Sequence, residues 1–173
     1  MTAQTITYRD ARPDEGGTLA GIAAATFIET FGPLYKLKDL NSFIAGYSAA
    51  AYAAELADPD YAVRFACIGD VPIGFCKVSR LKLPAPDPAP GAMELRQLYV
   101  YKPWHGEGVA QVLTDWARAV AQARGAPELW LSVFTENTRA RRFYVRNGFE
   151  EVAPYHFMVG DQADEDILCR LRL

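Results

Sequence analysis

Hydrophobic residues recur with two different periods along the chain, and this pattern predicts a fold that mixes strands with helices. Alternation of apolar and polar residues is typical of half-buried strands, and short apolar runs bounded by turn residues are typical of buried ones. The dipeptide Gly69-Asp70 separates two such segments, which predicts a hairpin. We expect strands at residues 5–9, 61–68, 71–81, 93–101, 128–134, 149–157 and 167–173.

Apolar residues spaced by three and four predict helices between these strands. Pro13-Asp14-Glu15 is the expected first turn of a helix that runs to about Thr30, with its acidic residues at the favourable end. Ser48 is the expected N-cap of an alanine-rich helix over 49–57, which Pro59 ends. Further helices are expected at 40–45, 108–124 and 137–147, the longest of them with Val109, Val112, Leu113, Trp116 and Val120 on its apolar face.

The order of these elements predicts an α/β (α+β) fold, with helices on both faces of a mixed sheet. The proline-rich segment 83–91 separates two strands rather than two domains, because neither side could form a full core alone. A length of 173 residues then indicates one domain, spanning 1–173.

Composition and charge narrow the classes of function. Half of the residues are hydrophobic, 23% are charged and the net charge is −3, which is typical of a soluble protein and disfavours non-specific nucleic-acid binding. No apolar run approaches the ~20 residues that cross a bilayer, and the first residues do not resemble a signal peptide. Three cysteines without metal-ligand spacing predict buried, reduced thiols, no metal site and a cytoplasmic location: Cys67, Cys76 and Cys169.

The segment from Glu94 to Ala110 carries the clearest chemical signal. A strand is followed by a short loop, in which Gly106 and Gly108 open a helix. Backbone N–H groups at a helix start are unpaired and favour an anion, and glycine lets the backbone approach it closely. The pattern predicts a site for a diphosphate-sized anion, although two glycines also suit a tight strand-to-helix turn.

Two motifs in this order resemble the GNAT N-acetyltransferase family over nearly the whole chain. The family's R/Q-x-x-G-x-G/A motif corresponds to His105-Gly106-Glu107-Gly108-Val109-Ala110, with His in place of Arg or Gln. The second motif, N-x-x-A-x-x-F-Y-x-x-x-G-F, is complete from Asn137 to Phe149. The resemblance implies a twisted, mostly antiparallel central sheet and acetyl-CoA as co-substrate.

The resemblance also implies where the cofactor binds. The pantetheine arm pairs with a strand backbone, and the backbone N–H of Val100 is the expected group that polarises the thioester carbonyl. Asn137 is expected to bond the arm or to serve as a helix N-cap, and Arg139 to meet phosphate or remain solvated. The implied cofactor residues are Leu98, Tyr99, Val100, His105, Gly106, Glu107, Gly108, Val109, Ala110, Gln111, Asn137, Arg139 and Tyr144.

Two residues are the candidate acid and base of acetyl transfer. Tyr144 stands where the family places a tyrosine beside the cofactor sulfur, so it is the expected general acid; its alternative role is packing beside Phe143. Glu94 lies eleven residues before His105, the spacing of the base in histone-type members, so it is the expected general base. Its alternative is a strand-edge charge paired with Arg96 or Lys102.

Shorter stretches resemble the bacterial spermine/spermidine acetyltransferase branch, which implies a polyamine acceptor. A polyamine needs spaced carboxylates, and Glu29 is the favoured one because it lies among aromatic residues. A protein amine, an amino acid, an aminoglycoside and a non-catalytic acyl-CoA sensor remain open, as does the homodimer that is common in the family. The other candidate carboxylates are Glu55, Asp58, Asp60 and Asp161.

Overall fold

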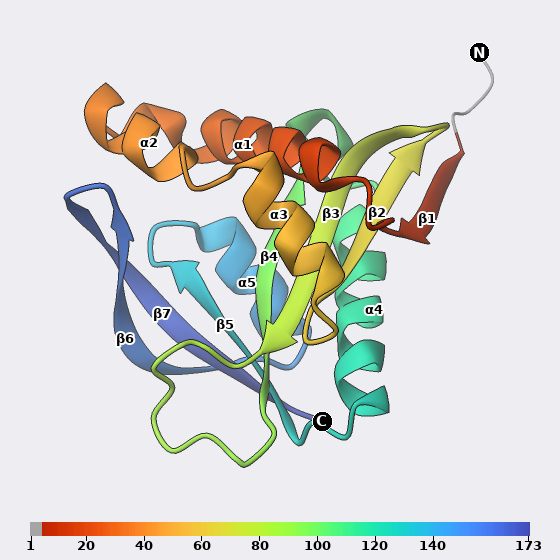
Figure 1. Ribbon diagram of the computed structural model, residues 1–173. Coiled ribbons are helices and arrows are strands. Elements are labelled where there is room, and N and C mark those ends of the chain that lie inside the picture. The colour runs from red at the N-terminus through yellow and green to blue at the C-terminus, as the bar shows by residue number, and fades with distance from the viewer. Residues whose placement is uncertain (1–4) are drawn as a thin grey trace.

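The computed structural model describes residues 5–173, in which one seven-stranded sheet has the order β1-β2-β3-β4-β5-β7-β6 (Figure 1). Neighbouring strands are antiparallel except β4 and β5, which are parallel. The predicted class, a mixed and mostly antiparallel sheet, is therefore confirmed. The strands are β1 Ile6–Asp10, β2 Ala62–Ile68, β3 Val71–Arg80, β4 Met93–Val100, β5 Glu128–Phe134, β6 Glu150–Val159 and β7 Gln162–Arg172.

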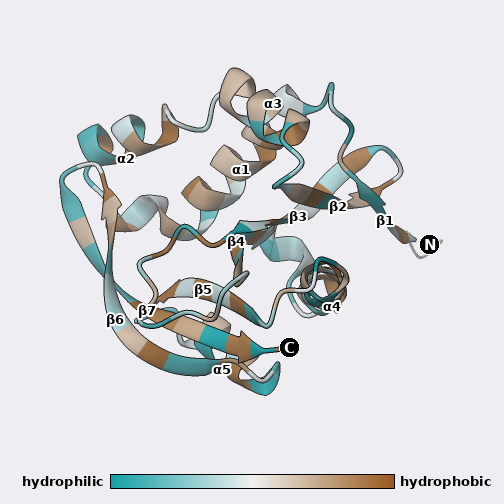
Figure 2. Ribbon diagram, turned by 60° about the horizontal axis from the view of Figure 1, so that its bottom comes forward, coloured by the Kyte–Doolittle hydropathy of each residue, from teal (hydrophilic) through white to brown (hydrophobic). Residues whose placement is uncertain are grey.

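Helices cover both faces of the sheet, and Figure 2 shows α1, α2 and α3 on one side and α4 and α5 on the other. The larger core cluster lies under α4 and α5, and a second cluster lies between α1, α3 and strands β2 and β3. None of the helices within residues 5–173 is long and apolar enough to cross a membrane. The helices are α1 Gly16–Phe31, η1 Gly32–Leu34, α2 Leu37–Ile44, α3 Ala49–Ala57, η2 Lys102–Trp104, α4 Val109–Ala123 and α5 Thr138–Arg146.

Most predicted elements are confirmed, and three expectations are corrected. The first helix begins at Gly16 rather than Pro13, because Glu15 turns its side chain back to Arg9 and Arg12. Val112 is 42% exposed, since the buried face of α4 follows Val109 and Leu113. Strand β7 begins at Gln162, five residues before the expected start, because a tight turn joins it directly to β6.

At the centre of the sheet, β4 and β5 are joined by very few residue pairs. Strands β4 and β5 are in register only at Met93↔Leu129 and Glu94↔Trp130, and beyond these pairs they diverge. A β-bulge falls at the same level, because Lys77 pairs with Gln97 while the next residue of β3 pairs with Leu95, which leaves Arg96 extra. Bulges bend a strand and redirect a side chain, so this one sends Arg96 out of the regular alternation.

The first two helices are fastened at both ends. At the start of α1, the Glu15 carboxylate accepts two hydrogen bonds from Arg9, at 2.7 and 2.8 Å, and one from the backbone N–H of Arg12. At the other end, the backbone N–H of Asp161 donates to Asp39 of α2 at 3.0 Å, and Tyr35 donates to Asp164. The segment α1–α2 therefore spans from β1 to the β6–β7 hairpin.

Replacement of Glu15 tests the first of these anchors. Hydrogen bonds from Arg9 lower the pKa of Glu15 from 4.5 to about 2, so its contribution to stability is complete above pH 4.5 and is lost as the pH falls towards 2. We expect Glu15→Gln to lower the free energy of unfolding at pH 7 by about 2 kcal/mol. Urea denaturation at pH 7, 5 and 3 should show this difference shrinking.

Asp14→Asn is the matched control, since Asp14 also contacts Arg12 but its side chain is 81% exposed. We expect a change below about 0.5 kcal/mol, because exposed ion pairs contribute little. Equal effects of the two substitutions would contradict the anchoring role of Glu15.

Candidate functional site

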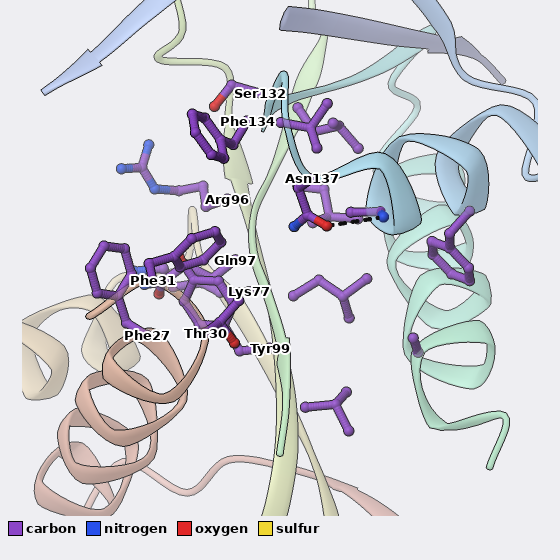
Figure 3. A pocket seen from close by; sticks show the side chains of 18 of the residues that line it. Phe27, Thr30, Phe31, Lys77, Arg96, Gln97, Tyr99, Ser132, Phe134 and Asn137 are labelled. Carbon is purple, nitrogen blue, oxygen red and sulfur yellow. Dashed lines mark hydrogen bonds between the residues drawn. The ribbon is translucent and has the colours of Figure 1, made fainter. Parts of the chain in front are cut away.

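A cavity of about 770 Å³ opens where β4 and β5 diverge. Leu98, Tyr99 and Val100 line it from β4, and Leu131 to Phe134 line it from β5. Figure 3 shows Phe27, Thr30 and Phe31 of α1 on one side of β4 and Asn137 on the other. The cavity therefore passes from one face of the sheet to the other through the gap between the strands.

The predicted glycine loop lines this cavity at the start of α4. Gly106 and Gly108 have φ of +90° and +79°, the left-handed region that favours glycine. A Cβ at either position would meet nothing within 4 Å, so both glycines face open space. The first N–H groups of α4 lack intrahelical partners, so the cradle fits a phosphate group.

His105 fastens this loop to β4. Its Nε2 lies 2.7 Å from the carbonyl oxygen of Val100 and donates to it, since a carbonyl only accepts. Burial lowers the pKa of His105, so the ring is neutral at neutral pH with its proton on Nε2. At the motif position where the family has Arg or Gln, this chain thus has a histidine whose side chain is hydrogen-bonded to the backbone of β4.

Beyond Glu94, the backbone of β4 directs groups into the gap that make no pairs with β5. The N–H of Tyr101 donates to Ile73 of β3 at 2.9 Å, and backbone groups alternate in direction along a strand. The Val100 carbonyl accordingly points away from β3, towards His105, and the N–H of Val100 shares this direction. The geometry is compatible with the expected role of this N–H in polarising a thioester carbonyl.

Tyr144 lies on the α5 side of the gap and lines the cavity. Its ring packs edge-on against Phe143 and Phe149, with centroids 5.4 and 5.6 Å away. Burial raises the pKa of Tyr144 above its ordinary value, so the phenol keeps its proton across the physiological range. Its packing is thus established, and its hydroxyl remains available as a proton donor.

The other expected cofactor residues fall into two groups. Asn137 caps α5 by accepting from the N–H of Ala140 at 3.2 Å, and it lines the cavity together with Arg139. Gln111 also lines the cavity, while its amide bonds Asn147 at 2.7 Å and so ties α4 to the end of α5. Glu107, by contrast, is exposed and does not line the cavity.

Glu94 lies away from the cavity, so its position does not support the expected role of general base. The residue is 5% exposed and does not line the cavity. Its carboxylate accepts from the backbone N–H groups of Lys82 and Leu83, at 2.8 and 3.1 Å, and pairs with Arg96 at 3.2 Å. Glu94 therefore anchors the start of the proline-rich loop, because its register opposite Trp130 places it before the strands diverge.

Glu29 is likewise displaced from the expected acceptor site. Its carboxylate accepts from the backbone N–H of Lys102 at 3.0 Å, which ties α1 to the loop after β4, and it does not line the cavity. Of the other candidate carboxylates, Glu55 lines the cavity but pairs with buried Lys77 at 2.5 Å. Asp161 pairs with Lys38 on the surface.

The cavity contains polar groups on the α1–α2 side that the sequence patterns did not indicate. Asp164 and Asp166 of β7 and Arg96 of the bulge all line it. Gly160-Asp161 after an apolar strand is a hairpin signal, and recognising it would have placed both aspartates on a strand, with one face in common. Aromatic rings surround them: Phe27, Phe31, Tyr35, Phe43, Tyr47 and Phe157.

Asp166 has a distinctive ionisation. Burial, opposed by a hydrogen bond from Ser132 and assisted by the charge of Asp164, raises the pKa of its carboxyl from 3.8 to about 6. A carboxylate with this pKa is ionised at neutral pH and is a stronger proton acceptor than an ordinary aspartate.

Comparison with known proteins identifies the family. The acetyltransferase (GNAT) family model matches residues 34–149. An uncharacterized N-acetyltransferase of Mycobacterium bovis is 32% identical over 149 residues, which cover 86% of this chain and 91% of the relative. An uncharacterized N-acetyltransferase of Lactobacillus delbrueckii subsp. lactis is 24% identical over 153 residues, 88% of each protein.

Solved structures share the fold. The PaiA N-acetyltransferase of Thermoplasma acidophilum, in complex with coenzyme A, superposes with a TM-score of 0.79 at 20% identity and covers 98% of this chain and 99% of its own. A GCN5-related N-acetyltransferase of Rhodopseudomonas palustris has a TM-score of 0.75 at 22% identity, covering 100% and 99%.

Substitution in the glycine cradle tests anion binding. We expect Gly108→Ala to weaken acetyl-CoA binding about tenfold, because a Cβ strains the left-handed backbone and enters the space that a phosphate needs. Isothermal titration calorimetry measures the change. Gly125→Ala is the matched control: Gly125 follows the other end of α4, has φ of +73° and also faces open space.

Both substitutions carry the same backbone strain, so both should lower stability by about 1 kcal/mol. Only Gly108→Ala should lower affinity. A similar loss of affinity in both variants would contradict the cradle.

Proposed function

Because the chain belongs to the acetyltransferase (GNAT) family, and is thus an acetyl-CoA-dependent N-acetyltransferase, we propose that it acetylates a small primary amine, with a polyamine as first candidate. The observation that carries the proposal is the cavity itself. It connects the glycine cradle at the start of α4 with a pair of buried aspartates on the opposite face of the sheet.

Acetyl-CoA supplies an activated acetyl group as a thioester. We assign its pyrophosphate to the N–H groups around Gly106 and Gly108, and its pantetheine arm to the free edge of β4 at Leu98 and Val100. The open cradle and the unpaired backbone groups support this assignment. Arg139 is the proposed side-chain partner of a phosphate, because it lines the same part of the cavity beside His105.

Tyr144 is the proposed general acid. Burial raises its pKa, so the phenol carries its proton at neutral pH, which is the form that a proton donor to a leaving thiolate needs. Its position on the α5 side of the gap supports this role, because the unpaired edge of β4 lies between Tyr144 and the aspartates.

Two features of the α1–α2 side support a cationic acceptor. Asp164 and Asp166 are 7% and 6% exposed and line the cavity, so they attract an ammonium group. The aromatic rings around them suit a cation with a hydrocarbon chain, through cation–π and apolar contact. Arg96 lines the same space and pairs with Glu94, so its charge is partly offset.

The function is tested by release of free thiol from acetyl-CoA in the presence of spermidine, spermine, a lysine peptide, amino acids and an aminoglycoside. Turnover with polyamines alone would support the finer proposal. Turnover with another amine would replace the polyamine and keep the activity. Binding of acetyl-CoA with no turnover on any amine would contradict the proposed acceptor class and favour an acyl-CoA sensor.

Tyr144→Phe tests the general acid on the best acceptor of this panel. We expect kcat to fall about 100-fold, because the leaving thiolate loses its proton donor. The affinity for acetyl-CoA should change less than twofold, since the ring still packs against Phe143 and Phe149. Phe143→Leu is the packing control, and we expect it to lower stability more than kcat. An unchanged kcat in Tyr144→Phe would remove Tyr144 from the acid role.

A further inference from the structure

We propose that Asp166 is the general base that deprotonates the acceptor ammonium, the role that the sequence suggested for Glu94. The inference rests on the proposed function and adds to it a named proton acceptor. It is carried by the position of Asp166 in the sheet, by the engagement of its neighbour and by its separation from Tyr144.

The strand register places Asp166 on the acceptor side of the gap. Asp166 pairs with Phe134 of β5 and with Tyr155 of β6, and directly paired residues point to the same face. Asp164, two residues earlier, shares this face and pairs with Phe157, which contacts Phe43 of α2 with centroids 5.6 Å apart. Asp166 therefore lies beneath the α1–α2 segment and borders the cavity.

The two aspartates differ in what they bind. Asp164 accepts from the Tyr35 hydroxyl on one oxygen and from the Gln162 amide, at 2.9 Å, on the other. Asp164 is thus committed to holding the α1–α2 segment against the hairpin. Asp166 is neighboured by the Ser132 hydroxyl, and it keeps carboxylate capacity for a ligand.

The surroundings of Asp166 set its ionisation. Burial is the main cause that raises the pKa of its carboxyl to about 6; Ser132 on β5 opposes the rise and Asp164 on β7 adds to it. Tyr155 on β6 pairs with Asp166, and Tyr35 before α2, whose pKa burial raises, lines the cavity together with Arg96 of β4. Asp166 is therefore ionised at neutral pH and becomes protonated as the pH falls through about 6.

Base and acid lie on opposite faces of the sheet. Tyr144 packs in the cluster of Leu131 and Val133, which alternate along β5 with Ser132 and Phe134 on the Asp166 face. Proton removal from the amine and proton delivery to sulfur thus occur on two sides of the gap between β4 and β5. An acetyl group lying in this gap would be reached from both.

In the proposed step, the acetyl group moves from sulfur to nitrogen and the nitrogen loses two protons. Asp166 takes one proton from the ammonium, and the nitrogen lone pair then forms the C–N bond to the acetyl carbon. The C–S bond breaks with its electron pair on sulfur, which takes the Tyr144 proton. The second proton shed by nitrogen restores the phenol, and Asp166 releases its proton to water, so one proton is produced for each amide formed.

The test is the pH profile of kcat/KM, from pH 5 to 9.5, with the best amine of the panel. For the unaltered protein we expect the value to fall below about pH 6 and to be level above it. Asp166→Asn should be about 100-fold slower at pH 7, and its rate should rise with the fraction of free amine, approaching the unaltered protein at alkaline pH.

Three further variants make the result specific. Asp166→Glu should restore the fall of kcat/KM at acidic pH. Asp164→Asn should keep this fall but move it to lower pH, because a charge that raises the pKa of Asp166 is gone. Glu94→Gln should leave the fall of kcat/KM at the same pH. Acetyl-CoA affinity within twofold in Asp166→Asn shows that the fold is intact.

Three outcomes overturn the assignment. Asp166→Asn leaves the pH profile unchanged, Asp166→Asn lowers the rate equally at every pH, or Glu94→Gln abolishes the fall of kcat/KM at acidic pH instead. A lack of turnover in the unaltered protein would overturn the proposed function itself. Turnover with an unchanged Asp166→Asn profile would overturn only the base.

Discussion

The short parallel contact between β4 and β5 is the constraint on which the rest of the site depends. Two residue pairs, at Met93 and Glu94, hold the two parts of the sheet together, and every residue beyond them lines a gap. Fewer pairs would leave the sheet in two parts, and more would close the cavity. The buried carboxylate of Glu94 strengthens this point, because it fixes the adjoining loop and the bulged Arg96 at the level where the strands separate.

The two sides of the gap differ in chemical character. On the α4–α5 side, the helix start and its glycines suit a phosphate, and Tyr144 sits among apolar residues. On the α1–α2 side, buried aspartates and aromatic rings suit a cation. The cavity therefore presents environments of opposite electrostatic character on the two faces of the sheet.

Sequence patterns predicted the elements well where the signal is local. The Ser48 cap, the Gly69-Asp70 hairpin and the limits of β5 follow from propensity and turn chemistry, and the family motifs indicated the glycine cradle. The positions of Glu94 and Glu29 could not be predicted in this way. Spacing along the chain does not specify whether a carboxylate meets a ligand or a backbone N–H from a distant loop, and for both residues the backbone is the partner.

The position of Asp166 in the cavity was not predicted, because β7 was expected to begin one residue after it.

The gap also has a consequence for association between molecules. Unpaired strand edges on the outside of a protein recruit other strands and promote aggregation. Here the unpaired edges of β4 and β5 face each other inside the molecule, between the helical layers that Figure 2 shows above and below the sheet. A strand from another protein would have to thread between those layers, whereas a slender ligand can enter. The fold thus keeps hydrogen-bonding backbone available for binding without offering it as a template for aggregation.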